Sequence, residues 1–183
     1  MSARVKRLPL FVYGTLVPGH GFANFIKELE PRCHLFPPSV ARGSSSSTYT
    51  VARVKGWQIF HLLAGFPASR PGKQEDEVVG ALVWPHGIDD DDESKYMETI
   101  HACDQLEKFS GVVGDEKNEY QRIEIETRQT NGENVNAWIY ECLLDTTGAL
   151  KIKDGNWPKY MKENDLQDAG EDWSDLNAAK ARD

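Results

Sequence analysis

An apolar run near the start of the chain, Phe11–Leu16, is followed directly by Val-Pro-Gly. Such a run predicts a buried strand that ends in a tight turn with free backbone N–H groups, because glycine permits backbone conformations closed to other residues. Phe22, Phe25, Ile26 and Leu29 then have the i, i+3, i+4, i+7 spacing of an amphipathic helix. Free amides and a helix N-terminus together attract carboxylates or phosphates. Many strand-turn-helix units bind nothing, so both alternatives stay open at this point.

Short segments typical of strands fill the middle of the chain. Thr48–Val54 and Trp57–Leu63 are rich in β-branched and aromatic residues and flank a Lys-Gly pair, which predicts two strands paired across a turn. Gly65-Phe66-Pro67 ends that pair. Val78–Trp84 predicts a further strand, in which Gly80 indicates a bulge or a close backbone approach.

The strongest hairpin signal lies further along the chain. Apolar and charged side chains alternate over Tyr120–Thr127, Asn131-Gly132 supplies a turn, and Val135–Leu144 is a second β-rich run. Arg122 is on the charged face of the first strand. It is either a solvated strand residue or, if its end of the strand faces a pocket, the partner of a carboxylate.

A second helix is predicted behind the acidic run Asp89–Glu93. The run lacks the spaced oxygens and the turn glycine of a calcium loop, and acidic residues favour the positive end of a helix. Tyr96, Ile100, Cys103 and Glu107 follow at spacings of four, three and four, which places them on one stripe. Burial there would raise the pKa of Glu107 and make it a proton acceptor or donor near neutral pH. The alternative is that Glu107 lies at the helix end and turns out into water.

Length and composition limit the classes of function. With 183 residues, we expect one domain over 1–183, with a core at about 8–160 and a charged tail at 161–183. A formal net charge of −8, a pI near 5.2 and scattered Lys and Arg argue against nucleic acid as a partner. No apolar segment has the length of a membrane span, so no membrane partner is expected. The oligomeric state is left open.

Cysteine and histidine usage adds two expectations. Cys33, Cys103 and Cys142 are odd in number and widely spaced, which favours reduced thiols in a cytoplasmic setting. The five histidines lack zinc-ligand spacing, and CxxC, GxSxG, P-loop and GxGxxG motifs are absent from the sequence. No metal or other cofactor is therefore expected.

Seven short motifs occur in an order that resembles the gamma-glutamylcyclotransferase-like family, including its gamma-glutamylamine cyclotransferase branch. The motifs are Phe11-Val12-Tyr13-Gly14-Thr15-Leu16, Gly65-Phe66-Pro67, Val79-Gly80-Ala81-Leu82-Val83, Asp104-Gln105-Leu106-Glu107, Tyr120-Gln121-Arg122, Ala137-Trp138-Ile139-Tyr140 and Gly155-Asn156-Trp157. Each motif is weak alone, whereas the ordered set is fairly specific. The resemblance implies an α+β fold: a small mixed β-barrel, closed or nearly closed, with flanking helices.

The resemblance also implies a site and a reaction. The family's Tyr-Gly-Thr-Leu turn cradles the carboxylate end of a gamma-glutamyl substrate, the Glu of its D-x-x-E motif is the acid/base, and the Tyr of its Tyr-x-Arg motif lines the pocket. The implied reaction is attack of the substrate's α-amine on its side-chain amide carbonyl, releasing 5-oxoproline and an amine or peptide. The matching residues here are Tyr13, Gly14, Thr15 and Leu16 for the turn, Glu107 for the acid/base and Tyr120 for the pocket wall.

Other functions stay open from the sequence. The same fold also fits a non-catalytic binder of small carboxylates or a stress-associated interaction protein. A carboxylate-based hydrolase using Asp104 and Glu107 is a weaker hypothesis, because Asp104 fits the role of a helix-end hydrogen-bonding residue. Lys108–Glu119 looks enlarged relative to compact family members, as do the serine-rich segment 43–47 and the acidic run. These enlargements leave the leaving group of the substrate open.

Overall fold

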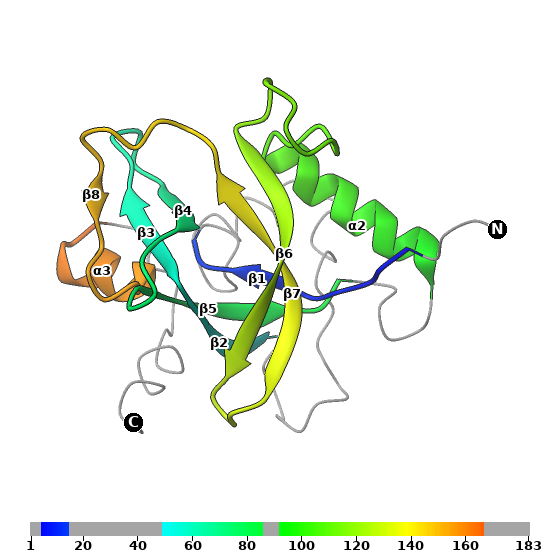
Figure 1. The fold of residues 1–183 in the computed structure, drawn as a ribbon, viewed down its shortest axis with the longest axis horizontal. Helices are drawn as coiled ribbons and strands as arrows, with labels where there is room; N and C mark the ends of the chain where they lie inside the picture. Colours follow the sequence, from blue (N-terminus) through cyan, green and yellow to red (C-terminus); the bar gives the residue numbers. More distant parts are fainter. Residues whose placement is uncertain (1–4, 15–48, 86–91, 167–183) are drawn as a thin grey trace.

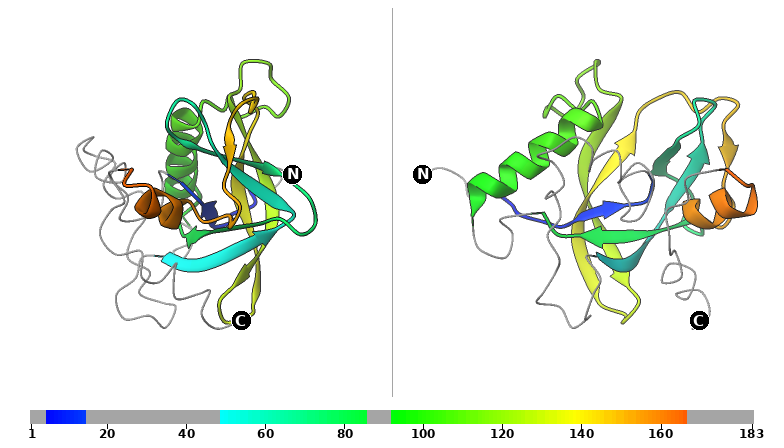
Figure 2. Two further views of the ribbon diagram at one scale, coloured as in Figure 1. Left: turned by 90° about the vertical axis from the view of Figure 1, so that its left-hand side faces the viewer. Right: turned by 180° about the vertical axis from the view of Figure 1, so that it is seen from behind.

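A computed structural model of the chain describes residues 5–14, 49–85 and 92–166 and contains two β-sheets. Five strands form a closed barrel in the order β1 (Leu10–Val12), β5 (Glu77–Val83), β2 (Tyr49–Lys55), β6 (Tyr120–Gln129) and β7 (Asn134–Cys142). A second sheet has the order β4 (Pro67–Pro71), β3 (Trp57–His61) and β8 (Leu150–Lys151). The helices α2 (Glu93–Leu106) and α3 (Trp157–Glu163) lie at opposite ends of the molecule's long axis (Figures 1 and 2).

The barrel closes through the short strand β1. This strand is antiparallel to β5 and parallel to β7, with Leu10 opposite Trp138. The backbone N–H of Trp138 donates to the carbonyl of Pro9 at 2.8 Å and extends this closure by one residue. The small mixed barrel with flanking helices that the resemblance implied is thereby confirmed.

Both faces of β1 are buried, which explains why its sequence is an unbroken apolar run. Leu10 and Val12 belong to a core cluster that includes side chains of α2. Phe11 and Tyr13, which alternate with them, belong to a second cluster that includes Trp157 of α3. The strand therefore joins the two halves of the core, and its C-terminal end has a fixed position.

The second predicted helix is confirmed as α2. Asp92 is its N-cap and accepts a hydrogen bond from the backbone N–H of Lys95 at 3.1 Å, as expected for the end of an acidic run. Tyr96, Ile100 and Cys103 are buried along one stripe. The Tyr96 hydroxyl accepts from the indole N–H of Trp138 at 3.0 Å, which fixes the helix against β7.

The expected pairing of the segments on either side of Lys55 and Gly56 is wrong. Both segments are strands, but β2 pairs with β5 and β6, whereas β3 pairs with β4 and β8. Gly56, at φ 74°, accepts from the N–H of Gly72 and donates to the carbonyl of Asp76, each at 2.7 Å. This left-handed residue turns the chain out of the barrel and into the second sheet.

The sequence did not predict strand β4, which begins at Pro67 and ends at Pro71, because Gly65-Phe66-Pro67 indicated the end of a strand pair. Both prolines lie at the ends of an edge strand, where a missing N–H donor is tolerated. The close approach expected at Gly80 is confirmed. A Cβ there would lie 2.5 Å from the carbonyl oxygen of Val12.

The β6–β7 hairpin is confirmed, with nine residue pairs from Tyr120–Cys142 to Arg128–Asn134. Helix α3 continues to Glu163 and buries Met161, so the first residues of the tail expected at 161–183 are helical. The remainder of that tail, the helix expected at 22–29 and the serine-rich segment at 43–47 lie outside the described residues.

Candidate active site

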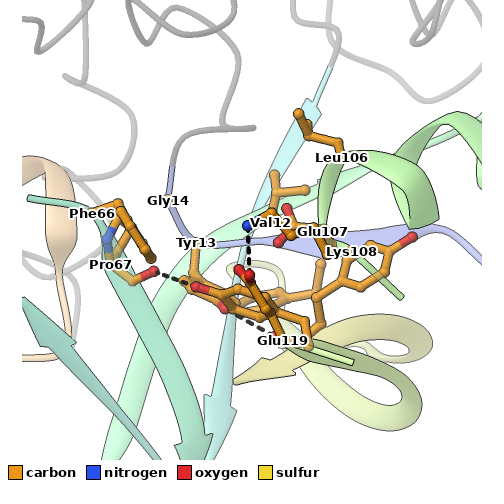
Figure 3. A pocket seen from close by; sticks show the side chains of 12 residues that line it. Val12, Tyr13, Gly14, Phe66, Pro67, Leu106, Glu107, Lys108 and Glu119 are labelled. Atoms are coloured by element: carbon orange, nitrogen blue, oxygen red, sulfur yellow. Dashed lines mark hydrogen bonds and ion pairs between the residues drawn. The ribbon is translucent and has the colours of Figure 1, made fainter. Parts of the chain in front are cut away.

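A pocket of about 240 Å³ lies where several elements end together. Figure 3 shows Phe66 and Pro67 on one side and Leu106, Glu107 and Lys108 on the other. The lining also includes the end of β1 and the first residues of the β6 segment. The described lining residues are Phe11, Val12, Tyr13, Gly14, Phe66, Pro67, Leu106, Glu107, Lys108, Glu119, Tyr120 and Tyr140.

The structure brings most of the expected site residues into this one pocket. Tyr13, Gly14, Glu107 and Tyr120 all line it, although Tyr120 is more than a hundred residues from Tyr13 in the chain. Thr15 and Leu16, the other two residues of the expected turn, lie outside the described residues.

The pocket wall leaves no room for a side chain at position 14, so this position requires glycine. A Cβ on Gly14 would lie 2.3 Å from Cγ of Pro67, much closer than carbon atoms approach without overlap. Gly14 is not among the described residues with positive φ. The expectation that this glycine serves a special backbone conformation is therefore wrong at this position, and close packing against the start of β4 is the reason for it.

Two buried tyrosines shape the floor of the pocket. The hydroxyl of Tyr13 donates to the carbonyl of Tyr140 at 2.9 Å and accepts from the backbone N–H of Ser69 at 3.3 Å. The hydroxyl of Tyr120 donates to the carbonyl of Pro67 at 3.5 Å. Burial raises the pKa of both phenols, with a further contribution from Glu107 in each case. Both side chains are neutral at physiological pH and offer the pocket polar hydroxyls without charge.

Glu107 is the C-cap of α2, held in place by a Schellman motif. The N–H of Phe109 donates to the carbonyl of Asp104 at 2.8 Å, and the N–H of Lys108 donates to that of Gln105 at 3.3 Å. Lys108 has the left-handed φ of 52° that this motif requires, a position where glycine is usual. The bonds fix the direction in which the half-buried Glu107 side chain leaves the helix.

The carboxyl group of Glu107 has a strongly shifted pKa. Burial raises its pKa from 4.5 to about 7, because the pocket removes the water that would stabilise the charged form. The C-terminal end of a helix is also unfavourable for a negative charge. Glu107 does lie at the helix end, as one alternative proposed, yet its side chain lines the pocket. Such a group exchanges protons readily near neutral pH.

Asp104 and Arg122 form an ion pair behind the pocket wall. The Nε of Arg122 lies 3.0 Å from Oδ1 of Asp104, and the guanidinium lies over the ring of Trp138, 5.1 Å from its centroid. The hydroxyl of Tyr140 donates to the same Oδ1 at 2.7 Å. Arg122 is therefore the partner of a carboxylate, as one alternative expected. Asp104 is not among the lining residues, which argues against a hydrolase that uses Asp104 with Glu107.

The sequence interpretation missed three polar lining residues, Lys108, Glu119 and Tyr140. It also did not name the apolar lining residues as part of the site: Phe11, Val12, Phe66, Pro67 and Leu106. Tyr140 lies in a motif that carried the family resemblance, so that motif was a usable signal. Lys108 and Glu119 are the two ends of the segment that looked enlarged. Their side chains form an ion pair at 2.5 Å, and the N–H of Glu119 donates to the carbonyl of Lys108 at 3.3 Å. The segment is thus closed at its base, beside the pocket.

Two features are absent from the described part of the chain. In that part, no three His, Cys, Asp or Glu side chains are grouped so that they could hold a metal ion. Neither described helix has the length and apolar character needed to cross a membrane.

A known family model covers most of the chain. The family model for gamma-glutamyl cyclotransferase, AIG2-like, matches residues 10–159, which include every described lining residue. The chain belongs to this family. Membership in the gamma-glutamyl cyclotransferase, AIG2-like family supports an activity of the cyclotransferase type. No curated protein sequence is significantly similar to the chain.

Two solved structures show the same fold at low sequence identity. At5g39720.1 from Arabidopsis thaliana is 17% identical, with a TM-score of 0.53 over 91% of this chain and 90% of its own. YkqA from Bacillus subtilis is 23% identical, with a TM-score of 0.52 over 88% of this chain. The matched region spans 44% of the length of YkqA. Both similarities concern the fold alone.

Proposed function

We propose that this gamma-glutamyl cyclotransferase family member cyclises a gamma-glutamyl group to 5-oxoproline and releases an amine or peptide. The observation that carries the proposal is the half-buried carboxyl group of Glu107, whose pKa is raised to about 7 inside a pocket that Tyr13, Gly14 and Tyr120 also line. A site that only binds an anionic ligand has no use for a carboxylate beside that ligand.

The reaction needs little chemistry from the protein. The substrate's α-amine attacks its own γ-carbonyl carbon, a C–N bond closes the five-membered lactam, and the original amide C–N bond breaks. Glu107 accepts a proton from the attacking nitrogen and returns one to the leaving nitrogen. Both reacting groups belong to one molecule, so holding them together in the pocket supplies much of the acceleration.

Tyr13, Gly14 and Tyr120 hold the gamma-glutamyl group in this proposal. The turn that begins at Gly14 binds the substrate's α-carboxylate through backbone N–H groups, with Thr15 and Leu16 as its expected further members. Gly14 lets the chain pass close to Pro67, and the two phenols, neutral at physiological pH, contact the substrate without repelling its carboxylate.

The test is release of 5-oxoproline from a panel of gamma-glutamyl amines and peptides, followed by mass spectrometry. Glu107→Gln keeps the shape and removes the base, so we expect unchanged binding and a loss of turnover of about 10²–10⁴-fold. The matched control is Glu119→Gln, which removes a carboxylate from the same pocket and should retain turnover of an uncharged gamma-glutamyl amide. Full activity of Glu107→Gln would place catalysis elsewhere. Absence of 5-oxoproline with every substrate would favour a non-catalytic binding protein.

A further inference from the structure

Lys108 occupies an unusual position beside the proposed base. It is the only Lys or Arg among the described residues that line the pocket. The protein carries a net charge of −8, and the other charged lining side chains in the described part are the carboxyl groups of Glu107 and Glu119. Among the described lining residues, Lys108 is therefore the only one whose charge attracts an anionic group to the pocket.

The backbone of Lys108 has a conformation that is costly for a residue with a side chain. Its φ of 52° is in the left-handed region, where an L-residue other than glycine costs about 1–2 kcal/mol. Glycine would satisfy the Schellman motif at this position without that cost. Backbone strain of this kind concentrates at functional sites, so an observed outlier is a reason to look for a function.

Glu119 holds the ammonium group of Lys108 over the pocket. Its own backbone is anchored on both sides, since its N–H donates to Lys108 and its carbonyl accepts from the N–H of Leu143 at 2.9 Å. The Lys108 side chain is 63% exposed and that of Glu119 is 35% exposed. An ammonium has three N–H donors, and the bond to Glu119 uses one of them. The bond to Glu119 thus leaves two N–H donors of this largely exposed ammonium for other acceptors.

Glu107 and Lys108 are neighbours in sequence, and both line the same pocket. The Cα atoms of Glu107 and Lys108 are about 3.8 Å apart across one peptide bond. If Glu107 returns a proton to the leaving nitrogen, a carboxylate two bonds from that nitrogen is within reach of the lysine. An α-amino acid joined through its α-nitrogen has its carboxylate there.

We propose that Lys108, positioned by Glu119, binds the carboxylate of the leaving group and thereby selects gamma-glutamyl amino acids over gamma-glutamyl amines. This inference rests on the proposed function, because it assigns the leaving group at the same site. Phe66 and Leu106, which lie on different sides of the pocket in Figure 3, supply apolar contacts for the amino acid's side chain.

Three substrates that differ only in the leaving group test the proposal. Gamma-glutamyl-alanine carries the carboxylate, gamma-glutamyl-ethylamide lacks only that group, and the monoamide of ethylenediamine replaces it with a cation. We expect the wild-type KM to be about tenfold lower for the alanine compound than for the ethylamide, the size of one hydrogen bond to a charged group.

Two lysine variants test whether Lys108 causes this difference in KM. Lys108→Met keeps the length and the backbone strain but removes the charge, so we expect it to raise the KM for gamma-glutamyl-alanine about tenfold and leave the ethylamide unchanged. Lys117→Met, an exposed lysine in the same segment, should change neither KM. Equal effects of Lys108→Met on both substrates would overturn the proposal. Preference of the wild type for the cationic amide, lost in Glu119→Gln, would overturn it in favour of Glu119 as the selecting group.

Binding separates failure of this proposal from failure of the proposed function. Calorimetry on Glu107→Gln measures affinity for the alanine compound and the ethylamide while turnover is slowed about 10²–10⁴-fold. If no wild-type activity appears but the alanine compound binds about tenfold more tightly through Lys108, the carboxylate site stands and the cyclisation does not. Turnover of all three compounds with equal KM and equal affinity would leave the cyclisation intact and refute the carboxylate site.

Discussion

The hydroxyl of Tyr140 on β7 donates to Oδ1 of Asp104 on α2 at 2.7 Å, one helical turn before Glu107. The bond ties the pocket wall to the helix that carries the proposed base. Arg122 on β6 pairs with the same carboxylate, so one buried charge joins three elements. Asp104 thereby connects Tyr140, which lines the pocket, with the helix that ends at Glu107.

Tyr140→Phe removes that bond and little else. We expect a loss of about 2 kcal/mol in the free energy of unfolding, typical of a hydrogen bond to a charged group, measured by urea denaturation. In an Asp104→Ala background the same change should cost less than about 0.5 kcal/mol, because its partner is already absent. Equal costs in the two backgrounds would show that the hydroxyl is not coupled to Asp104.

The activity of the wild type should depend on the ionisation of Glu107. A base must be deprotonated, so we expect kcat/KM, which reports the free enzyme, to rise with pH through an apparent pKa of about 7 and then level off. At pH 5 it should be about 100-fold below the plateau, two units below that pKa. A free glutamate would give a midpoint near 4.5 instead, and a profile flat between pH 5 and 8 would rule out Glu107 as the titrating group.

The same raised pKa predicts a change in stability with pH. Below about pH 4.5 the carboxyl group is protonated in both folded and unfolded chains, and it contributes no difference. Between about 4.5 and 7 it ionises only in the unfolded chain, so its contribution destabilises the folded state progressively and then levels off, by at most about 3 kcal/mol.

Glu107→Gln removes this contribution. Chemical denaturation should therefore find the variant close to wild type at pH 4 and more stable than wild type at pH 8. A difference that is the same at both pH values would indicate that the carboxyl group titrates normally in the folded protein.

The contact of Gly14 with Pro67 predicts a compensating pair of substitutions. Gly14→Ala places a Cβ against Cγ of Pro67 and should cost about 1–3 kcal/mol of stability, as overpacking does, and should raise the KM for a gamma-glutamyl substrate. Adding Pro67→Ala removes Cγ, so the double variant should recover part of both losses. Thermal unfolding and steady-state kinetics measure the two effects. Failure of Pro67→Ala to restore either property would mean that Gly14 is needed for another reason.

The sequence by itself determined the elements whose signals are local. Alternation of apolar and charged residues with an Asn-Gly turn gave the β6–β7 hairpin, and the acidic run with apolar positions at helical spacing gave α2. The continuous apolar run predicted the buried strand β1, because both faces of this strand are buried in the core. The ordered motifs predicted that Tyr13, Gly14, Glu107 and Tyr120 share one site.

Tertiary structure decided the properties that depend on what surrounds a residue. Strand pairing at Gly56 was set by the carbonyl of Asp76 and the N–H of Gly72, which lie far along the chain, so the local Lys-Gly signal indicated a hairpin where the chain changes sheets. Spacing could suggest that Glu107 has a raised pKa, but only burial in the folded pocket moves that pKa to about 7. The pairing of Lys108 with Glu119 likewise exists because the segment between them closes on itself, a relationship that no periodicity in the sequence encodes.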